Sequence, residues 1–154
     1  IGGEYNFTHC TFVNYWNFNN RKTPSILLNN WYEDINNNII IRDLNKADFT
    51  NCIIYGSLSS EISFQKEENG EFNYLFNHSL IRLDPTINTD NNTNYSSTLI
   101  NQDPIFIDPY NADFHLKENS PAIDNGFATQ IDTDIEGNSR TNLQPDIGAY
   151  EFQN

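Results

Sequence analysis

The pattern of apolar and polar positions repeats three times along the chain. Residues 7–12 (FTHCTF), 49–54 (FTNCII) and 76–81 (FNHSLI) each begin with an aromatic residue, pass through a polar step to His or Asn, and end in a new apolar alternation. Asn and His are among the few residues other than glycine that adopt a positive φ at low cost. Each segment is therefore predicted to form two short strands joined at a sharp corner. The corner residues are His9, Asn51 and His78.

Repetition of one corner is typical of a β-solenoid, in which each coil stacks on the previous one. Parallel strands lie about 4.8 Å apart, so equivalent residues of successive coils should stand above one another. This predicts an aromatic ladder of Phe7, Phe49 and Phe76. It also predicts a ladder of small buried residues, Cys10, Cys52 and Ser79. Helical periodicity is almost absent, so we expect an all-β chain.

The remaining apolar segments complete the coils. Strands are predicted at residues 25–31, 37–44, 61–64 and 72–76. Residues 84–97 are polar and rich in Asn and Thr, which predicts a long loop. The coils should thus occupy residues 1–83, and residues 84–154 should form the long loop and a cap that protects the unpaired edge of the last coil. The first residues run almost directly into the first corner, so further coils are expected upstream.

Five motifs follow in order in the last third of the chain. They are DPIF (103–106), FHL (114–116), SPAIDNG (120–126), DIEGNSR (134–140) and DIGAYE (146–151). Together with the segments around Cys10 and Cys52, they resemble the C-terminal signature of bacterial right-handed parallel β-helix proteins, which are frequent in Bacteroidetes and often carry a choice-of-anchor C-terminal region. Glu136 stands where that family often has Asp, and no sorting domain follows Phe152.

The resemblance implies the C-terminal coils of a right-handed parallel β-helix followed by an irregular cap. It also implies a protein of the cell surface or the extracellular space, held at the outer membrane by an N-terminal lipid anchor that lies outside these residues. Most proteins of this kind have no assigned activity, so the resemblance informs the fold more than the function.

Charge and hydropathy narrow the possible partners. The net charge is −13, and the eight Lys and Arg residues are scattered along the chain. Phosphate binding needs clustered basic residues, so nucleic acid is not an expected partner. No segment approaches the roughly 20 apolar residues of a transmembrane helix. An acidic chain of this kind more often serves solubility or binds divalent cations.

Acidic residues alternate near the C-terminal end. Asp132, Asp134 and Glu136 are spaced like the oxygen ligands of a calcium loop, but the later bidentate Glu of an EF-hand is missing. Calcium is therefore a possible cofactor. The alternative is a turn around Gly137 in which Asp134 pairs with Arg140.

Several polar residues have structural interpretations. Asp124 occupies a turn in which a carboxylate can accept backbone N–H bonds, and it resembles a structural cap residue of the family. Asp146 should pair with Arg140 or bind backbone groups and so fix the final strand. Cys10 and Cys52 share one motif position and should stack as small apolar residues, with a disulfide between them as the alternative. For His9 and His78 a place in the corner ladder is favoured over catalysis.

Aromatic residues outside the ladders are candidates for ligand binding. Tyr15, Trp16, Trp31 and Tyr32 lie in or beside the first long excursion. Aromatic faces stack on sugar rings, and loops on a rigid scaffold often carry binding residues. The alternative is that these side chains cover the flank of the solenoid as a small satellite core.

We therefore expect a non-catalytic surface module that binds a polysaccharide or assembles with an envelope protein. One alternative is the C-terminal part of a polysaccharide lyase or glycoside hydrolase that acts on an acidic polysaccharide. The basic residues near the predicted strands are Arg42, Lys46 and Arg82, and the clustered aspartates of an inverting glycosidase are missing, so no catalytic residue is assigned. A second alternative is a structural stalk or adhesin end.

Overall fold

The computed structural model describes residues 1–90, 93–140 and 144–153, and it is an all-β structure. Within these residues the chain builds two four-stranded parallel sheets. The first has the order β1 (Gly3–Thr8), β6 (Leu44–Thr50), β9 (Leu75–Asn77) and β11 (Tyr95–Ser96). The second contains β2 (Thr11–Asn14), β7 (Ile53–Gly56), β10 (Leu80–Ile81) and β12 (Leu99–Ile100).

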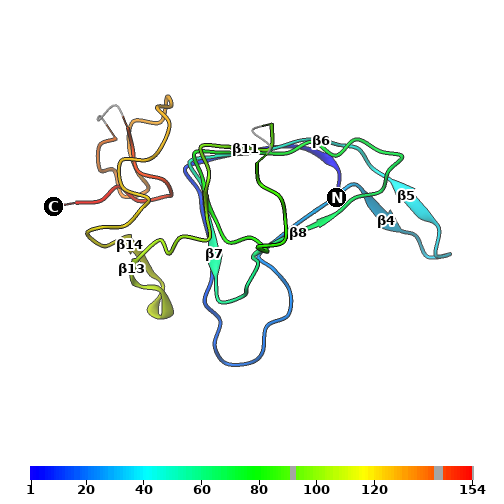
Figure 1. The fold of residues 1–154 in the computed structure, drawn as a ribbon, viewed down its shortest axis with the longest axis horizontal. Helices are drawn as coiled ribbons and strands as arrows, with labels where there is room; N and C mark the ends of the chain where they lie inside the picture. Colours follow the sequence, from blue (N-terminus) through cyan, green and yellow to red (C-terminus); the bar gives the residue numbers. More distant parts are fainter. Residues whose placement is uncertain (91–92, 141–143, 154) are drawn as a thin grey trace.

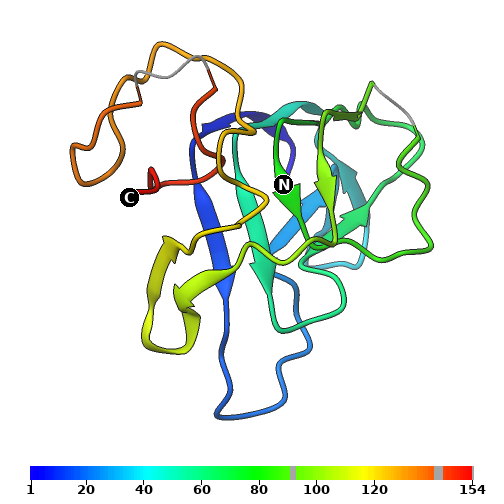
Figure 2. The same cartoon turned by 60° about the vertical axis from the view of Figure 1, so that its left-hand side comes forward.

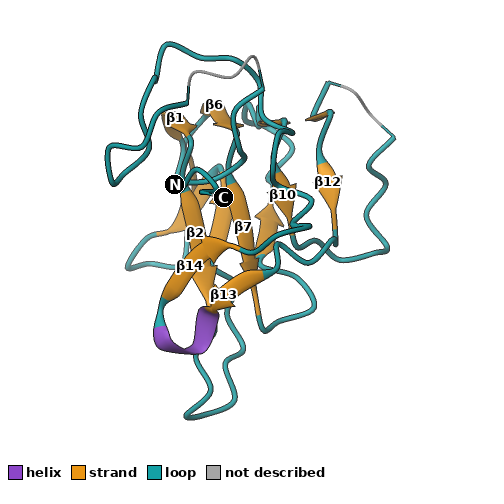
Figure 3. Cartoon of the chain, turned by 90° about the vertical axis from the view of Figure 1, so that its left-hand side faces the viewer, coloured by secondary structure: helices purple, strands orange, loops and turns teal. Residues whose placement is uncertain are grey.

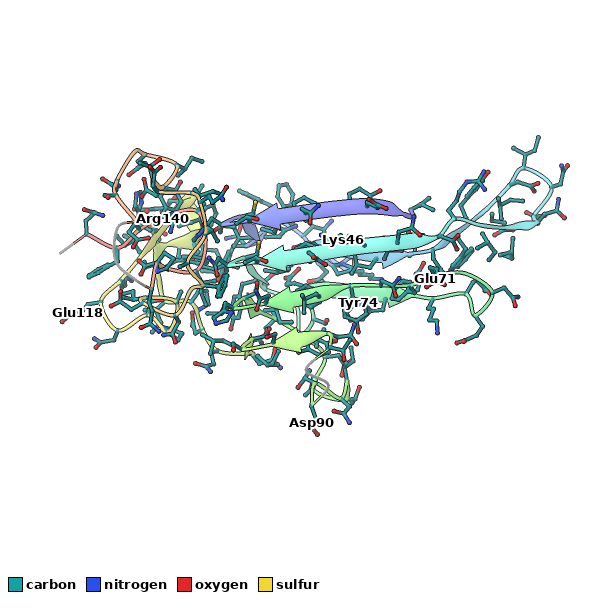
Figure 4. The ribbon with its side chains drawn as sticks, turned by 90° about the horizontal axis from the view of Figure 1, so that it is seen from above. Lys46, Glu71, Tyr74, Asp90, Glu118 and Arg140 are labelled. Atoms are coloured by element: carbon teal, nitrogen blue, oxygen red, sulfur yellow. The ribbon has the colours of Figure 1, made fainter. Side chains whose placement is uncertain are left out.

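Each strand of the first sheet is joined by a corner to a strand of the second, and we call such a pair a rung. The four rungs are β1–β2, β6–β7, β9–β10 and β11–β12. The rungs overlap when seen down the shortest axis of the molecule (Figure 1), and the strands of the first sheet lie one below another when seen from above (Figure 4).

The aromatic ladder is confirmed. Phe7 pairs in register with Phe49, and Phe49 pairs with Phe76. The ring centroids of both pairs are 5.0 Å apart, close to the spacing of parallel strands. Tyr95 continues the stack above Phe76 at 5.8 Å. These rings form the centre of a core enclosed by the rungs.

The predicted corners are also confirmed, because His9, Asn51 and His78 have φ angles of 52°, 53° and 46°. A fourth corner lies at Ser97, with a φ of 48°. It leads into strand β12, which pairs with β10 in parallel register. The rungs therefore continue to Ile100, beyond the boundary expected at residue 83, and part of the predicted 84–97 loop is the strand β11.

Hydroxyl groups tie neighbouring rungs together at the ladder of small residues. The Ser79 hydroxyl accepts a hydrogen bond from the backbone N–H of Cys52 (3.0 Å) and donates one to the carbonyl of Phe49 (3.0 Å). The Thr98 hydroxyl donates to the carbonyl of Phe76 in the same way (2.8 Å). A small polar residue at this position therefore satisfies backbone groups that the corner leaves unpaired.

Shorter elements branch from the rungs. Strands β3 (Ile26–Asn29) and β8 (Ile62–Gln65) pair in parallel, and β4 (Trp31–Glu33) pairs with β5 (Ile39–Ile41) as an antiparallel hairpin. The strand predicted over 25–31 is thus divided at Asn30. Its buried side chain accepts a hydrogen bond from the N–H of Glu67 (2.7 Å) and donates one to the carbonyl of Glu67 (2.9 Å).

The second sheet is buried on both faces. Ile54 and Ile81 point into the core enclosed by the rungs, whereas Ile53 and Leu80 point outward. The outward pair is covered by the hairpin of β13 (Phe106–Asp108) and β14 (Asp113–Leu116), which are joined by the 3-10 turn η1 (Pro109–Asn111), and by the chain that follows. Figure 3 shows the strands of the second sheet side by side, with this hairpin in front.

The C-terminal residues 101–140 and 144–153, called the tail below, lie along the flank of the rungs (Figures 1 and 2). The N–H of Gly148 donates to the carbonyl of Asn51 (2.8 Å), and that of Ala149 donates to the hydroxyl of Thr11 (2.9 Å). These two hydrogen bonds attach the tail to the first two rungs, and its apolar side chains pack with Leu80 and Leu99 of the later rungs. The tail was expected as a cap on the last coil, whereas these contacts spread along the flank of the rungs. The tail covers the outward side chains of the second sheet, which would otherwise face water.

Among the described residues, the helical turns fall short of the length and apolarity of a membrane-spanning helix.

Candidate functional site

The most exposed aromatic side chains gather around the loop between β2 and β3. Trp16 is 55% exposed and Phe18 is 85% exposed, with ring centroids 5.1 Å apart. Tyr110, 64% exposed, lies in η1 of the tail. These three rings border a hollow of about 500 Å³ whose other lining residues include Asn17, Asn19, Asn20, Arg21, Ser57 and Leu58. We call it the aromatic hollow.

Tyr15 supports the wall of the aromatic hollow and does not face into it. Its ring makes edge contacts with Phe106 (6.3 Å) and Tyr110 (5.5 Å). Burial raises the pKa of its hydroxyl well above the usual value. Tyr15 therefore fits the alternative interpretation, in which the aromatic side chains cover the flank of the solenoid as a small satellite core. Its contact with Tyr110 places that residue beside the loop between β2 and β3.

Trp31 and Tyr32 are in a different part of the molecule. They lie in strand β4, opposite Ile41 and Ile40 of β5, and the guanidinium of Arg42 sits 5.3 Å from the centre of the Tyr32 ring. Figure 1 shows the β4–β5 hairpin at the right and the blue loop that follows β2 at the bottom. The structure therefore does not bring the four predicted binding residues together.

A buried ion pair anchors the loop that carries the aromatic hollow. The carboxylate of Glu61 is fully buried and accepts hydrogen bonds from both terminal nitrogens of Arg21. The hydroxyl of Ser25 (2.8 Å) and the N–H of Leu58 (3.0 Å) donate to the same carboxylate. Burial raises the pKa of Glu61, but the bonds from Arg21 and Ser25 outweigh it and hold the pKa below its usual value. No local sequence pattern indicates this pair.

A second and larger depression, a groove, lies beside β8. It has a volume of about 830 Å³, and Phe64, Phe72 and Tyr74 contribute to its walls. Lys22 and Lys66 also line it, and Lys66 pairs with the exposed Glu68 at 3.2 Å. Because Leu58 lines both this groove and the aromatic hollow, the two depressions adjoin.

The predicted calcium ligands are not gathered around one point. Asp134 accepts bonds from the N–H groups of Glu136 and Asn138, both at 2.8 Å, and from that of Glu151 at 2.9 Å. Asp132 is exposed, and the Glu136 carboxylate lies 3.1 Å from the ring of His115. In the part of the chain that the structure describes, no group of three or more His, Cys, Asp or Glu side chains could hold a metal ion.

Arg140 and Asp146 hold the end of the tail. Arg140 pairs with Glu151 at 2.6 Å, not with Asp134, and also donates to the carbonyl of Asp146. The carboxylate of Asp146 accepts the backbone N–H bonds of Asp124 (2.8 Å) and Phe152 (2.6 Å). Burial raises the pKa of Asp146. At Asp124 the φ angle is 52°, so this residue forms a left-handed turn.

The corner residues also attach the tail, a role that the sequence does not reveal. The side-chain amide of Asn51 accepts from the N–H of Phe127 and donates to its carbonyl, both at 2.7 Å. The same amide nitrogen lies 2.9 Å from the Nε2 atom of His9, which also contacts the Thr129 hydroxyl at 3.2 Å. The ring of His78 lies 5.4 Å from that of Phe127. One face of the corner ladder is thus the docking surface of the tail.

The two cysteines are free, with Cys10 half-buried and Cys52 buried. The basic residues considered for catalysis are engaged elsewhere. Lys46 pairs with Asp48 at 3.2 Å, and Arg82 donates to the hydroxyl of Tyr55 at 2.8 Å.

The chain has no match among models of protein families, among curated proteins or among solved structures. Its chemistry therefore has to be inferred from the site itself. Among the described residues that line the aromatic hollow there is no carboxylate, histidine or cysteine to act as a general acid, base or nucleophile. The hollow offers aromatic faces and side-chain amides, which suit stacking and hydrogen bonding to a polyhydroxylated ring.

Proposed function

We propose that this chain is a right-handed parallel β-helix that serves as a non-catalytic, glycan-binding module of the bacterial cell surface. Support for the helix comes from four rungs of parallel strands in register, because a crossover between parallel strands of one sheet is right-handed in about 98% of cases. An apolar hollow of about 350 Å³, lined by residues such as Phe7, Phe12 and Leu28, is left at the rung of β1 and β2, and a further coil would cover it.

The observation that carries the glycan-binding proposal is the exposure of Trp16, Phe18 and Tyr110 around one hollow. A cluster of exposed aromatic rings often marks a binding surface, and sugar rings stack on aromatic faces. The buried Arg21–Glu61 pair fixes the base of the loop, so the site is partly organised before a ligand arrives.

The surface location is supported by the tail motifs, which resemble those of β-helix proteins anchored at the outer membrane. A polysaccharide chain bound in the aromatic hollow could continue past Leu58 into the groove beside β8. There Lys22 and Lys66 would meet acidic substituents. Asp84 lines the same groove and Lys66 is paired with Glu68, so acidic and neutral polysaccharides are both tested below.

The test is a titration of acidic and neutral oligosaccharides into the protein by calorimetry, with the wild type and Trp16→Ala. Loss of one stacking face should weaken binding about two- to tenfold, since such contacts contribute about 0.5–1.5 kcal/mol. Tyr32→Ala is the matched control, because this ring lies in the β4–β5 hairpin away from the hollow. It should leave the affinity unchanged.

An unchanged affinity in Trp16→Ala would contradict the proposed site. Release of shortened or unsaturated products in the same assay would favour the lyase or hydrolase alternative. A protein that neither binds nor cleaves any glycan would favour a structural stalk.

A further inference from the structure

The corner ladder places two thiols one above the other in neighbouring rungs. Strands β2 and β7 pair in parallel directly after Cys10 and Cys52, and the N–H of Ile53 donates to the carbonyl of Cys10 at 2.9 Å. Parallel strands stand about 4.8 Å apart. This spacing lies within the 4.4–6.8 Å separation of α-carbons that a disulfide spans.

The two sulfur atoms also lie against the same stretch of the first rung. The Sγ atom of Cys52 is 3.5 Å from the carbonyl of Phe7, and that of Cys10 is 3.5 Å from the carbonyl of Thr8. The Cys52 thiol thus reaches across from its own rung to the end of β1. The contact between the two thiols lowers the pKa of the Cys10 thiol, whereas the same contact and burial raise the pKa of Cys52. Cys10 is therefore the thiol that reacts first as a thiolate.

Access differs between the two cysteines. Cys10 is half-buried and lines a hollow of about 510 Å³ between the first corner and the tail, whose other walls include Ile131 and Ile135. Cys52 is fully buried in the core between the rungs. A small molecule can therefore meet Cys10 first, and Cys52 can react only with what is already attached to Cys10.

We propose that Cys10 and Cys52 are a dithiol pair, in which Cys10 reacts with a small external disulfide and Cys52 then closes a disulfide between the first two rungs. The Cys10 thiolate attacks one sulfur of oxidised glutathione, the S–S bond breaks, and one glutathione thiolate leaves. Cys52 loses its proton, attacks the Cys10 sulfur and displaces the second glutathione. Two protein thiols are oxidised to one disulfide, while one glutathione disulfide is reduced to two thiols.

The closed disulfide would join the first two rungs at the two ends of the long segment that runs from Cys10 to Cys52. A cross-link that closes a loop of this length restricts the unfolded chain and so stabilises the fold. The inference is independent of glycan binding, because the thiols lie at the corner and not in the aromatic hollow.

The experiment treats the native protein with oxidised glutathione and follows its intact mass and its peptide map. The wild type should lose two hydrogen atoms, give one peptide pair joined through Cys10 and Cys52, and unfold about 5–10 °C higher. Dithiothreitol should reverse the change. Cys52→Ser places at this position the residue type that Ser79 supplies in the next rung, so this variant should fold. It should stop at a stable glutathione adduct on Cys10.

Cys10→Ser is the matched control, and its buried Cys52 should remain unmodified. A wild-type protein that accumulates the glutathione adduct without closing would overturn the inference. It would also be overturned if Cys10 reacted only after denaturation.

Discussion

The orientation of the Asn51 side-chain amide determines which protonation state of His9 fits the corner. The carbonyl oxygen of the Asn51 amide accepts from Phe127, so its nitrogen is the donor that faces the Nε2 atom of His9. His9 must therefore present an unprotonated Nε2 there, and the Thr129 hydroxyl beside it can donate to the same atom. Burial, with a smaller contribution from the charge of Arg140, lowers the pKa of His9 to about 4.

This arrangement predicts a loss of stability in mild acid. The unfolded chain binds a proton at His9 below pH 6.5, whereas the folded protein resists it down to about pH 4, so the unfolded state holds more protons in this window. The free energy of unfolding should therefore fall as the pH decreases from 6.5 towards 4. His9 alone should lower it by about 2 kcal/mol between pH 7 and pH 5.

Urea unfolding of the wild type and His9→Asn at pH 7 and pH 5 would measure the effect. Asn tolerates the positive φ of this corner and does not titrate, so the variant should lose less stability than the wild type over that interval. Parallel losses in the two proteins, or an NMR titration of His9 centred near pH 6.5, would contradict the prediction.

The backbone conformation at the corners is predictable because it is a local property. Asn and His tolerate a positive φ wherever they occur, and this identified His9, Asn51 and His78. Ser97 has no such preference, so its corner is hidden in the sequence. The partner of Asn51 is equally hidden, because Phe127 reaches it only through the path that the tail takes.

At the level of elements, one buried ion pair holds the loop between β2 and β3. Gly56 closes β7 without a side chain and so leaves room for the carboxylate of Glu61 beside the carbonyl of Asn14. Arg21 donates to Glu61, to the carbonyl of Asn14 (3.1 Å) and to that of Thr23 (2.8 Å). The guanidinium thereby joins the two ends of the loop.

Removal of one partner of this pair should be costly. Glu61→Ala leaves Arg21 buried without its carboxylate, which typically lowers the free energy of unfolding by about 3–5 kcal/mol. Glu68→Ala removes an acidic residue whose ion pair with Lys66 is exposed, and it should cost less than about 0.5 kcal/mol. Denaturant unfolding of both variants makes the comparison. Equal effects would show that the Arg21–Glu61 pair does not anchor the loop.

The sequence predicts strands at 25–31 and 37–44 but not their pairing as a hairpin. The turn between them depends on Asp34, whose carboxylate accepts from the N–H groups of Asn36 (2.8 Å) and Asn38 (2.9 Å). This closes an antiparallel hairpin and carries Trp31 and Tyr32 away from the loop of Trp16. The Asp34 turn is therefore the reason that Trp31 and Tyr32 do not join Trp16 in one binding site, although the four candidates were grouped by their spacing in the sequence.

For the whole molecule, the tail packs tightly against the rungs at Gly148. Its φ is 107°, and a Cβ atom there would stand 2.8 Å from the Cδ1 atom of Ile53 and 2.9 Å from the hydroxyl of Thr11. Gly148→Ala should lower the free energy of unfolding by about 2–4 kcal/mol, through backbone strain and overpacking together.

Gly137→Ala is the matched control. Gly137 also has a positive φ, of 88°, but nothing lies within 4 Å of its Cβ position. This variant should show the backbone strain alone, about 1 kcal/mol. Thermal unfolding of both proteins separates the two contributions. If the alanine variants were equally stable, close contact between tail and rungs at Gly148 would be disproved.

The position of the tail could have been inferred from one pattern. Strands β7 and β10 are continuous apolar runs with no alternation, which is typical of strands buried on both faces. Ile53 and Leu80 therefore needed a cover on the outer side. The tail was expected at the end of the last coil, because solenoids in general need an end cap. That general requirement was given more weight than the unbroken apolar runs of β7 and β10.

The bond between Ala149 and Thr11 joins residues 138 positions apart. In a simple repeat protein each unit touches its neighbours, so folding can begin anywhere and spread. Here the first rung is complete only when the tail has returned to it. Folding rates fall as the sequence separation of native contacts grows. The assembly of this protein is therefore governed by the closure of its longest loop, and its rungs and tail should form and melt as one cooperative unit.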